Sequence, residues 1–248
     1  MRASWILDRI IHRSRGLPRS LRELNYSLQL LSELSRLGWS RSVRSGVPVD
    51  CDGAPLPWYT YPAVQWLTSR LRPSDCVFEY GAGNSTLWFS KRVRSVVSVE
   101  HNEMWFNHLR SLVGSNVKLL LRSPCSQGEE GDKMSQYSTA IVNYPEGSFD
   151  VIVIDGAERV SCAREAVPRL KQDGIIIFDN SDRPAYQKGV ELLHAARLGR
   201  IDFYGFVPVY GVVSCTSVFI RFSLRWTGGE VPLVFQNYSL PISRRGWS

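Results

Sequence analysis

Residues 77–86 read Val77-Phe78-Glu79-Tyr80-Gly81-Ala82-Gly83-Asn84-Ser85-Thr86, and this stretch decides the expected fold. It starts as an apolar strand, carries one acidic residue, and then turns through Gly-x-Gly. Glycine accepts backbone angles that other residues resist, and its missing side chain lets a ligand approach the main chain. The next helix, expected from about residue 85, would offer free amide groups and a positive dipole end to a carboxylate. The stretch therefore predicts a strand, a tight turn and a helix that together bind a ligand.

A second strand is expected at residues 95–100, and it ends in Glu100, nineteen positions after Gly81. A carboxylate in this position can accept hydrogen bonds from both hydroxyls of a ribose. A nicotinamide site uses similar parts, but its fingerprint is Gly-x-Gly-x-x-Gly. Here Thr86 stands where the third glycine would be, and Glu79 has no role in that fingerprint.

The segment from Glu79 to Ser85 matches the pattern Glu-x-Gly-x-Gly-x-Ser and resembles the cofactor motif of class I S-adenosylmethionine-dependent methyltransferases. About residues 55–222 resemble bacterial members of this family whose substrate is undefined. An acidic residue often follows the third strand in that family, but this chain has Arg122-Ser123-Pro124-Cys125. His101 follows Glu100 and could either flank the adenine or be an ordinary surface residue. The cofactor-binding residues that the resemblance implies are Glu79, Gly81, Ala82, Gly83, Asn84, Ser85, Glu100, His101 and Asp155.

Strands and helices alternate from residue 75 onward, which predicts a parallel sheet with helices on both faces. Two final strands without a clear helix between them predict an antiparallel hairpin at the sheet edge. The expected fold is thus α/β: a Rossmann-like, doubly wound, mostly parallel seven-stranded sheet, with an N-terminal helical extension. We expect strands near 76–80, 95–100, 117–121, 150–155, 174–179, 201–209 and 215–225, and helices near 63–71, 85–92, 103–113, 159–170 and 184–197.

Acidic residues follow two of these strands. Asp155 ends the fourth strand, and Asp179 with Asn180 ends the fifth. Ligands in open parallel sheets bind at the carboxyl ends of the strands. The three residues are similar to the metal-binding trio of cation-dependent, catechol-type O-methyltransferases, which implies a Mg²⁺ ion held by Asp155, Asp179 and Asn180. Such an ion would lower the pKa of a bound hydroxyl.

Other interpretations of these acids remain open. Asp179 and Asn180 could cap the following helix, and Asp155 could pair with Arg159 or Arg183. The catechol-type family places a lysine base three residues after its first Asp, whereas this chain has Glu158 there. The sequence therefore assigns Asp155 and Asp179 to the catalytic end of the site but names no general base.

Residues 1–45 form a separate Arg-rich segment with nine Arg against three acidic residues, a net charge of +6 in a chain whose total is +7. Leucines recur in it at spacings of three and four, which predicts a helix with one apolar stripe. The stripe comprises Leu17, Leu21, Leu24, Leu28, Leu31, Leu34 and Leu37. We favour packing of this stripe on the body of the protein; an anionic membrane surface or an organelle transit peptide are the alternatives.

Residues 46–248 form the expected methyltransferase domain. Residues 46–62 are rich in proline and aromatic side chains, which suggests an ordered loop over the cofactor cleft or a cap on the core. The sequence Lys171-Gln172-Asp173-Gly174 suggests a helix end and a turn. Residues 123–144 lack apolar periodicity, and we expect a surface loop or a substrate lid there.

The composition narrows the class of protein. A hydrophobic content of 44% is ordinary for a globular protein. The five cysteines are scattered singly and do not cluster with the histidines, which argues against zinc and favours a reducing, cytoplasmic compartment. The body carries almost no net charge, so no nucleic-acid partner is expected.

We therefore expect methyl transfer from S-adenosylmethionine to a hydroxyl of a small-molecule or sugar-like acceptor. Two other classes of function remain. One is a nicotinamide-dependent oxidoreductase on the same fold. The other is a non-catalytic Rossmann-like module that its N-terminal helix attaches to a membrane or a protein partner.

Overall fold

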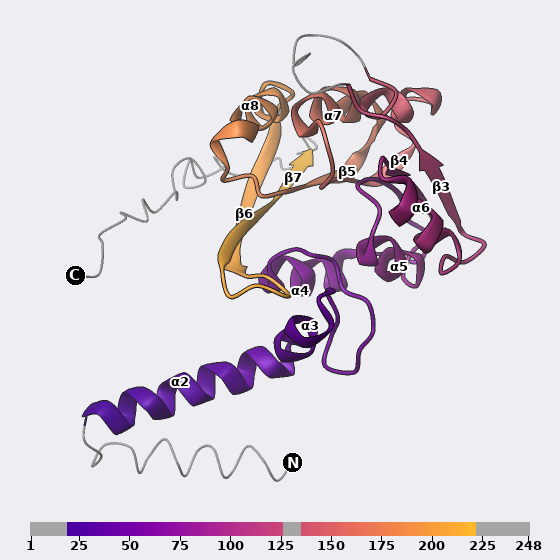
Figure 1. The fold of residues 1–248 in the computed structure, drawn as a ribbon. Helices are drawn as coiled ribbons and strands as arrows, with labels where there is room; N and C mark the ends of the chain where they lie inside the picture. The colour runs from indigo at the N-terminus through magenta and orange to yellow at the C-terminus, as the bar shows by residue number, and fades with distance from the viewer. Residues whose placement is uncertain (1–18, 126–134, 222–248) are drawn as a thin grey trace.

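A single sheet organises the computed structural model, which describes residues 19–125 and 135–221 (Figure 1). Its seven strands stand in the order β3-β2-β1-β4-β5-β7-β6. The first five are parallel, and β7 runs antiparallel to both β5 and β6. The strands are β1 Cys76–Tyr80, β2 Ser95–Glu100, β3 Val117–Leu121, β4 Phe149–Ile154, β5 Leu170–Asp179, β6 Leu198–Phe206 and β7 Val213–Arg221.

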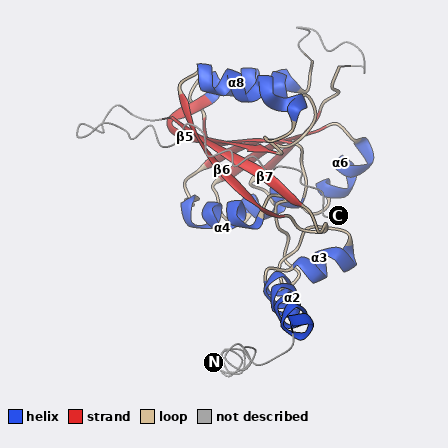
Figure 2. Ribbon diagram, turned by 90° about the vertical axis from the view of Figure 1, so that its left-hand side faces the viewer, coloured by secondary structure: helices blue, strands red, loops and turns tan. Residues whose placement is uncertain are grey.

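Helices cover both faces of the sheet, with α4 on one face and α8 on the other (Figure 2). The helices of the body are α4 Tyr61–Arg70, α5 Asn84–Ser90, α6 Glu103–Arg110, α7 Arg159–Ala166 and α8 Gln187–Ala195. Short 3-10 turns add Ser138–Asn143, Val167–Arg169 and Pro184–Tyr186. Two further helices, α2 Arg19–Arg36 and α3 Trp39–Ser45, precede the body.

The central strands are apolar on both sides because both sides are covered. Val77 of β1 packs with the helix α4 and α5 side chains, while the next residue, Phe78, packs with those of α7 and α8. The same alternation holds for Val151 and Ile152 of β4. A strand buried on two faces reads as a continuous apolar run instead of an alternating one. This is why residues 151–154 and 175–178 contain only Val, Ile and Phe.

The strand order fixes the place of the ligand site. The chain moves outward from β1 to β3 and then returns to β4 on the other side of β1. This reversal opens a crevice at the carboxyl ends of β1 and β4, where α/β proteins bind their ligands. The expected Rossmann-like sheet with an antiparallel edge hairpin is confirmed.

One local expectation is wrong. Residues 171–174 do not form a turn, because β5 already begins at Leu170 and pairs with Phe149 before the register shifts. Gly174 is inside the strand, and a Cβ atom there would be 2.7 Å from the Leu170 side chain. The glycine therefore makes room for packing in a strand.

The preferred packing of the leucine stripe is also wrong for the part of it that the structure describes. Helix α2 extends away from the sheet and packs mainly on α3 (Figure 1). Leu34 is buried, but Leu21, Leu24, Leu28 and Leu31 are each about half exposed. None of the helices in residues 19–125 and 135–221 has an apolar stretch that could cross a bilayer.

Candidate functional site

The glycine turn brings β1 into close contact with the end of β4. Gly81 has a φ of +96°, a backbone region that favours glycine. A Cβ atom on Gly81 would be 2.8 Å from Cα of Gly156, the residue after Asp155. Two hydrogen bonds hold the neighbouring strand ends: the Gly81 amide donates to Val99 O, and the Asp155 amide donates to Tyr80 O. Helix α5 begins at Asn84, in agreement with the expected start near residues 84–86.

Glu79 is fully buried beneath this turn. Its Oε2 accepts hydrogen bonds from the hydroxyls of Thr86, at 2.5 Å, and Ser98. The Thr86 hydroxyl in turn accepts from the Gly83 amide at 3.0 Å. The other oxygen, Oε1, is buried without a hydrogen-bond partner. Burial raises the pKa of Glu79 to about 7, with the hydroxyls of Ser85, Ser98 and Thr86 acting against that rise.

Glu100 is buried at the end of β2. Its Oε1 accepts hydrogen bonds from the backbone amides of His101 and Asn102, at 2.8 and 2.7 Å. Within the described residues, Oε2 has no hydrogen-bond partner. The His101 ring is half exposed, with Nδ1 3.2 Å from Glu100 Oε1. The ring meets the edge of Tyr137 at a centroid distance of 5.9 Å.

Arg159 ties together the ends of β4 and β5. Its Nη2 donates to Asp155 Oδ1 at 2.9 Å and to the Asp155 carbonyl at 3.1 Å. Its Nη1 donates to the Asp179 carbonyl and to Asn180 Oδ1, and its Nε donates to the Gly156 carbonyl. All five N–H bonds of the guanidinium are therefore used. Of the open interpretations, the pairing of Asp155 with Arg159 is the one observed.

Asp155 and Asp179 are neighbouring carboxyl groups at the strand ends; Asp179 is buried, and the Asp155 side chain is partly buried. Burial is the main cause that raises the pKa of each, and the charge of Asp155 raises that of Asp179 further. The Arg159 guanidinium acts against the rise in both. Two adjacent carboxyl groups that are largely shielded from solvent cannot both ionise at low cost. The pair therefore holds a proton more readily than a single exposed Asp.

The implied Mg²⁺ site does not fit this arrangement. The guanidinium of Arg159 contacts Asp155 Oδ1 and Asn180 Oδ1, where the ion would need ligands. Asp179 Oδ1 accepts instead from the Thr216 hydroxyl at 2.6 Å. In residues 19–125 and 135–221, no three His, Cys, Asp or Glu side chains are grouped to hold a metal ion. A cation of the chain itself takes the place that the resemblance gives to the metal.

The aromatic segment before α4 reaches these acids through two hydrogen bonds. The Thr60 amide donates to Thr216 Oγ1 at 3.1 Å, and Thr216 Oγ1 donates to Asp179. Tyr59 is fully buried, and its hydroxyl lacks a partner. Burial raises the pKa of Tyr59, and the nearby carboxylates of Asp155, Glu79 and Asp179 raise it further. The segment thus both caps the core and borders the strand ends.

Glu158, which stands where the catechol-type family has its lysine base, has a structural role here. Its Oε1 accepts from the Cys125 amide at 2.6 Å, and its Oε2 accepts from the Ser135 hydroxyl. These two residues flank positions 126–134, the nine of the 22 residues of the suggested lid that lie outside the described residues. Glu158 adopts a φ of +48°, which is uncommon for a residue with a side chain.

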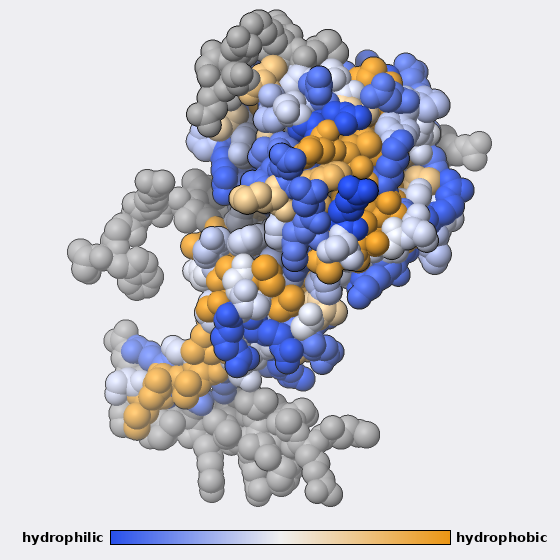
Figure 3. Space-filling view, turned by 45° about the vertical axis from the view of Figure 1, so that its right-hand side comes forward, coloured by the Kyte–Doolittle hydropathy of each residue, from blue (hydrophilic) through white to orange (hydrophobic). Residues whose placement is uncertain are grey.

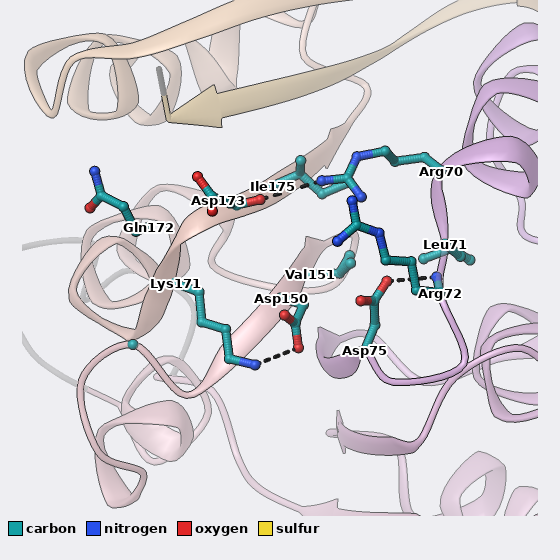
Figure 4. Close-up of a pocket in the computed structure, with 11 residues that line it drawn as sticks. Arg70, Leu71, Arg72, Asp75, Asp150, Val151, Lys171, Gln172, Asp173 and Ile175 are labelled. Carbon is teal, nitrogen blue, oxygen red and sulfur yellow. Dashed lines mark hydrogen bonds and ion pairs between the residues drawn. The ribbon is translucent and has the colours of Figure 1, made fainter. Parts of the chain in front are cut away.

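A separate pocket of about 390 Å³ lies at the amino ends of the strands, opposite the carboxyl ends that form the strand-end site (Figure 4). Its lining comes from residues around the amino ends of β1, β4 and β5, including Arg72, Asp75 and Asp173. Lys171 Nζ is 2.8 Å from Asp150 Oδ2, and both basic and acidic side chains line the pocket (Figure 4). This pocket contains none of the residues of the strand-end site.

Sequence reasoning missed Thr216 and Gly156. Thr216 reaches Asp179 because β7 pairs antiparallel with β5 in a register that places the two residues opposite each other. Nothing in the sequence sets that register. Gly156 could have been singled out from the sequence, because it directly follows an apolar strand and an acidic residue. Its importance comes from close packing on Gly81, which only the fold reveals.

Comparison with known proteins gives structural likeness only. No family model matches the chain, and no curated protein matches it either. Precorrin-6y C5,15-methyltransferase from Geobacter metallireducens is similar at a TM-score of 0.49 and 17% identity, covering 65% of this chain and 88% of that one. Precorrin 8w decarboxylase from Methanobacterium thermoautotrophicum gives a TM-score of 0.46 and 18% identity, with coverages of 71% and 97%. The 1,6-didemethyltoxoflavin-N1-methyltransferase of Burkholderia thailandensis gives a TM-score of 0.45 and 18% identity, covering 65% of this chain and 77% of that one. Likeness at this level concerns the arrangement of elements, so function has to be argued from the site.

Proposed function

We propose that this protein transfers a methyl group from S-adenosylmethionine to a hydroxyl group of a small-molecule acceptor. One observation carries the proposal. Two carboxyl groups, Glu79 and Glu100, flank the Gly81 turn at the reversal of strand order, and Glu79 Oε1 is buried without a hydrogen-bond partner. A buried acceptor without a partner is costly, so a ligand with a donor at this place would satisfy it, while Glu100 Oε2 is free to accept a second hydrogen bond from the same ligand.

The donors of the cofactor suit both places. An ammonium group can satisfy Glu79 Oε1, and ribose hydroxyls can satisfy Glu100 Oε2. Gly81 and Gly83 leave the main chain open between them. His101 and Asp155 would border the adenine and the methyl group. When bound, the cofactor supplies an electrophilic methyl group on a sulfonium.

The acceptor would lie beside Asp155 and Asp179. Arg159 fixes Asp155 and leaves the pair without a metal, so the chain itself must orient the acceptor and take up its proton. We assign proton uptake to the Asp155–Asp179 pair. With the cofactor bound, the Asp155–Asp179 pair would take the hydroxyl proton as the acceptor oxygen bonds to the methyl carbon and the electron pair of the former C–S bond stays on sulfur. Orientation supplies most of the remaining catalysis.

Two features speak against a nicotinamide cofactor. The third glycine of the dinucleotide fingerprint is replaced by Thr86, and that side chain holds Glu79. The sheet also differs from the six-stranded dinucleotide order, because antiparallel β7 lies between β5 and β6.

The test is thermal unfolding of the full chain with S-adenosylhomocysteine or NADH, each with and without Mg²⁺. At about 100 times its Kd, a ligand stabilises the folded state by about 2.7 kcal/mol, which is roughly 5–10 °C for a chain of this size. We expect this rise with S-adenosylhomocysteine alone and no further effect of Mg²⁺. A rise with NADH instead would replace the proposal with an oxidoreductase, and no rise with either would leave a non-catalytic module.

The catalytic step has its own test in Asp155→Asn. This change keeps the shape of the side chain and removes its proton acceptor. S-adenosylhomocysteine binding should persist within about threefold, while methyl transfer to any acceptor found by screening should fall by roughly 10²-fold or more. Unchanged turnover would remove Asp155 from the mechanism.

A further inference from the structure

Exposed apolar side chains gather at one end of this molecule. The described residues expose 17 large hydrophobic side chains, of which 10 belong to residues 21–58 and three to residues 210–213. Figure 3 shows such side chains along the protruding lower part of the molecule, which includes α2. Monomeric soluble proteins rarely expose contiguous apolar patches of this kind, and larger ones mark sites of interaction.

The two groups form one surface, because α3 and the tip of the β6–β7 hairpin touch. Trp39 Nε1 donates a hydrogen bond to the Tyr210 carbonyl at 2.9 Å. The Trp58 and Tyr210 rings lie 5.4 Å apart. We call the exposed apolar side chains of residues 21–58 and 210–213 the apolar face.

The apolar face borders the strand-end site. Asn84, the first residue of α5, donates a hydrogen bond from Nδ2 to the Pro48 carbonyl at 2.7 Å. The Thr60 amide reaches Thr216, which contacts Asp179. Whatever covers the apolar face therefore lies next to the crevice between β1 and β4.

Exposure on α2 is not confined to one seam. Leu24 and Leu28 recur at a spacing of four on one side, with exposed fractions of 54% and 57%. Tyr26 and Leu30 stand on the other side of the helix, at 54% and 50%. A coiled coil with a second copy would cover only a narrow seam of the first kind. A flat surface covers one side of α2 together with the exposed apolar groups of α3 and of the hairpin tip, which a coiled coil along α2 would leave uncovered.

Charge also distinguishes between a second copy of the chain and an anionic surface as the partner of the apolar face. Residues 1–45 carry a net charge of +6, and Arg22, Arg36, Arg41 and Arg44 are exposed on α2 and α3. Two copies that met through this segment would bring like charges together. An anionic surface would instead gain about 1 kcal/mol for each nearby arginine.

We propose that the apolar face docks on the surface of an anionic lipid bilayer. Helix α2 lies in the interface, its leucines enter the boundary between head groups and acyl chains, and its arginines meet the lipid charges. Trp58 and Tyr210 sit at head-group depth, where amphipathic rings are favoured. Docking in this way brings the strand-end site to the bilayer surface.

Vesicle flotation of the full chain tests this proposal. The vesicles contain phosphatidylcholine alone or with about 30% phosphatidylglycerol. We expect the protein to float with the anionic vesicles and much less with the neutral ones. Leu24→Glu together with Leu28→Glu should lower the bound fraction by roughly tenfold or more, because two apolar groups are lost and two negative charges are gained.

The matched control is Leu112→Glu. Leu112 follows α6 and lies outside the apolar face. Its exposed fraction of 51% is similar to the 54% of Leu24. This variant should bind anionic vesicles as the wild type does. Equal binding by the double variant would overturn the proposal, provided that its melting temperature shows it to be folded. Absence of binding by the wild type, with sedimentation showing a dimer that the double variant dissociates, would assign the apolar face to a second copy. Cofactor binding is measured separately, so failure here leaves the proposed reaction untouched.

Discussion

Glu79 carries a predictable pH dependence, because its carboxyl group is buried and its pKa is raised from 4.5 to about 7. When folding raises the pKa of a group, the stability that the group contributes is fully present below its pKa in the unfolded state. That stability is lost as the pH rises through its pKa in the folded state. The shift corresponds to about 3 kcal/mol lost between pH 4.5 and 7. Glu79→Gln cannot titrate and should lose less stability across this range.

The measurement is the melting temperature of wild type and Glu79→Gln from pH 5 to pH 8. The difference between the two curves should change in favour of the variant as pH rises. Asp155 and Asp179 titrate in both proteins, so the comparison removes their common effect and leaves the titration of Glu79 together with its influence on the pKa of Asp155. Parallel curves would mean that Glu79 is ionised throughout and that a neighbouring cation stabilises it.

Glu100 should decide cofactor affinity without deciding the fold. Its Oε2 is the oxygen proposed to bind ribose, and hydrogen bonds to a charged group contribute about 1.5–3 kcal/mol. Glu100→Ala should therefore weaken S-adenosylhomocysteine binding by roughly 10- to 100-fold in titration calorimetry. Glu103→Ala, an exposed change on α6, is the control and should bind normally. Unchanged affinity of Glu100→Ala would exclude ribose binding at this carboxylate.

At the scale of elements, the contact between the β1–α5 turn and the end of β4 determines the site. Gly81→Ala would combine a left-handed φ with a Cβ atom 2.8 Å from the Gly156 backbone, and neither backbone segment can move freely. We expect a loss of about 2–5 kcal/mol from strain and overpacking together.

Gly147→Ala is the matched control for this change. Gly147 also has a positive φ, +62°, but a Cβ atom there meets nothing within 4 Å. Only the backbone strain remains, so the loss should be about 1–2 kcal/mol. Chemical denaturation of the two variants measures the difference. Equal losses would show that the turn and β4 are not in tight contact.

The elements show where sequence reasoning succeeds and where it stops. The strands at 76–80, 95–100 and 117–121 were predicted with their observed bounds, because each is a short, mainly apolar segment between polar turns. The start of β5 was wrong, since Gly174 reads as a turn residue but packs inside a strand. The role of Thr216 depends on the hairpin register, and the place of Arg159 depends on rotamers at two strand ends. Periodicity contains neither kind of information.

At the scale of the whole molecule, the helical character expected for residues 1–45 is confirmed for the described part of that segment, but the expected packing of its leucines is wrong. A stripe of leucines at helical spacing predicts an apolar surface, and only the fold shows whether the same chain covers it. Here α2 points away from the sheet, and its leucines stay half exposed. The basic charge of this segment and its apolar surface therefore act at the same end of the molecule, which gives a bilayer interaction two components.

The two components should separate by salt. Screening shortens the reach of exposed charges from about 14 Å at 0.05 M salt to about 4 Å at 0.5 M, whereas apolar burial does not weaken with salt. Binding of the full chain to anionic vesicles should thus fall severalfold between these concentrations and level off above zero. Leu24→Glu with Leu28→Glu should fall toward zero at high salt, since little apolar contact remains. Flotation over a salt series measures both curves. Salt-independent binding would show that the arginines do not face the lipid, and complete loss in the wild type would show that the leucines do not enter it.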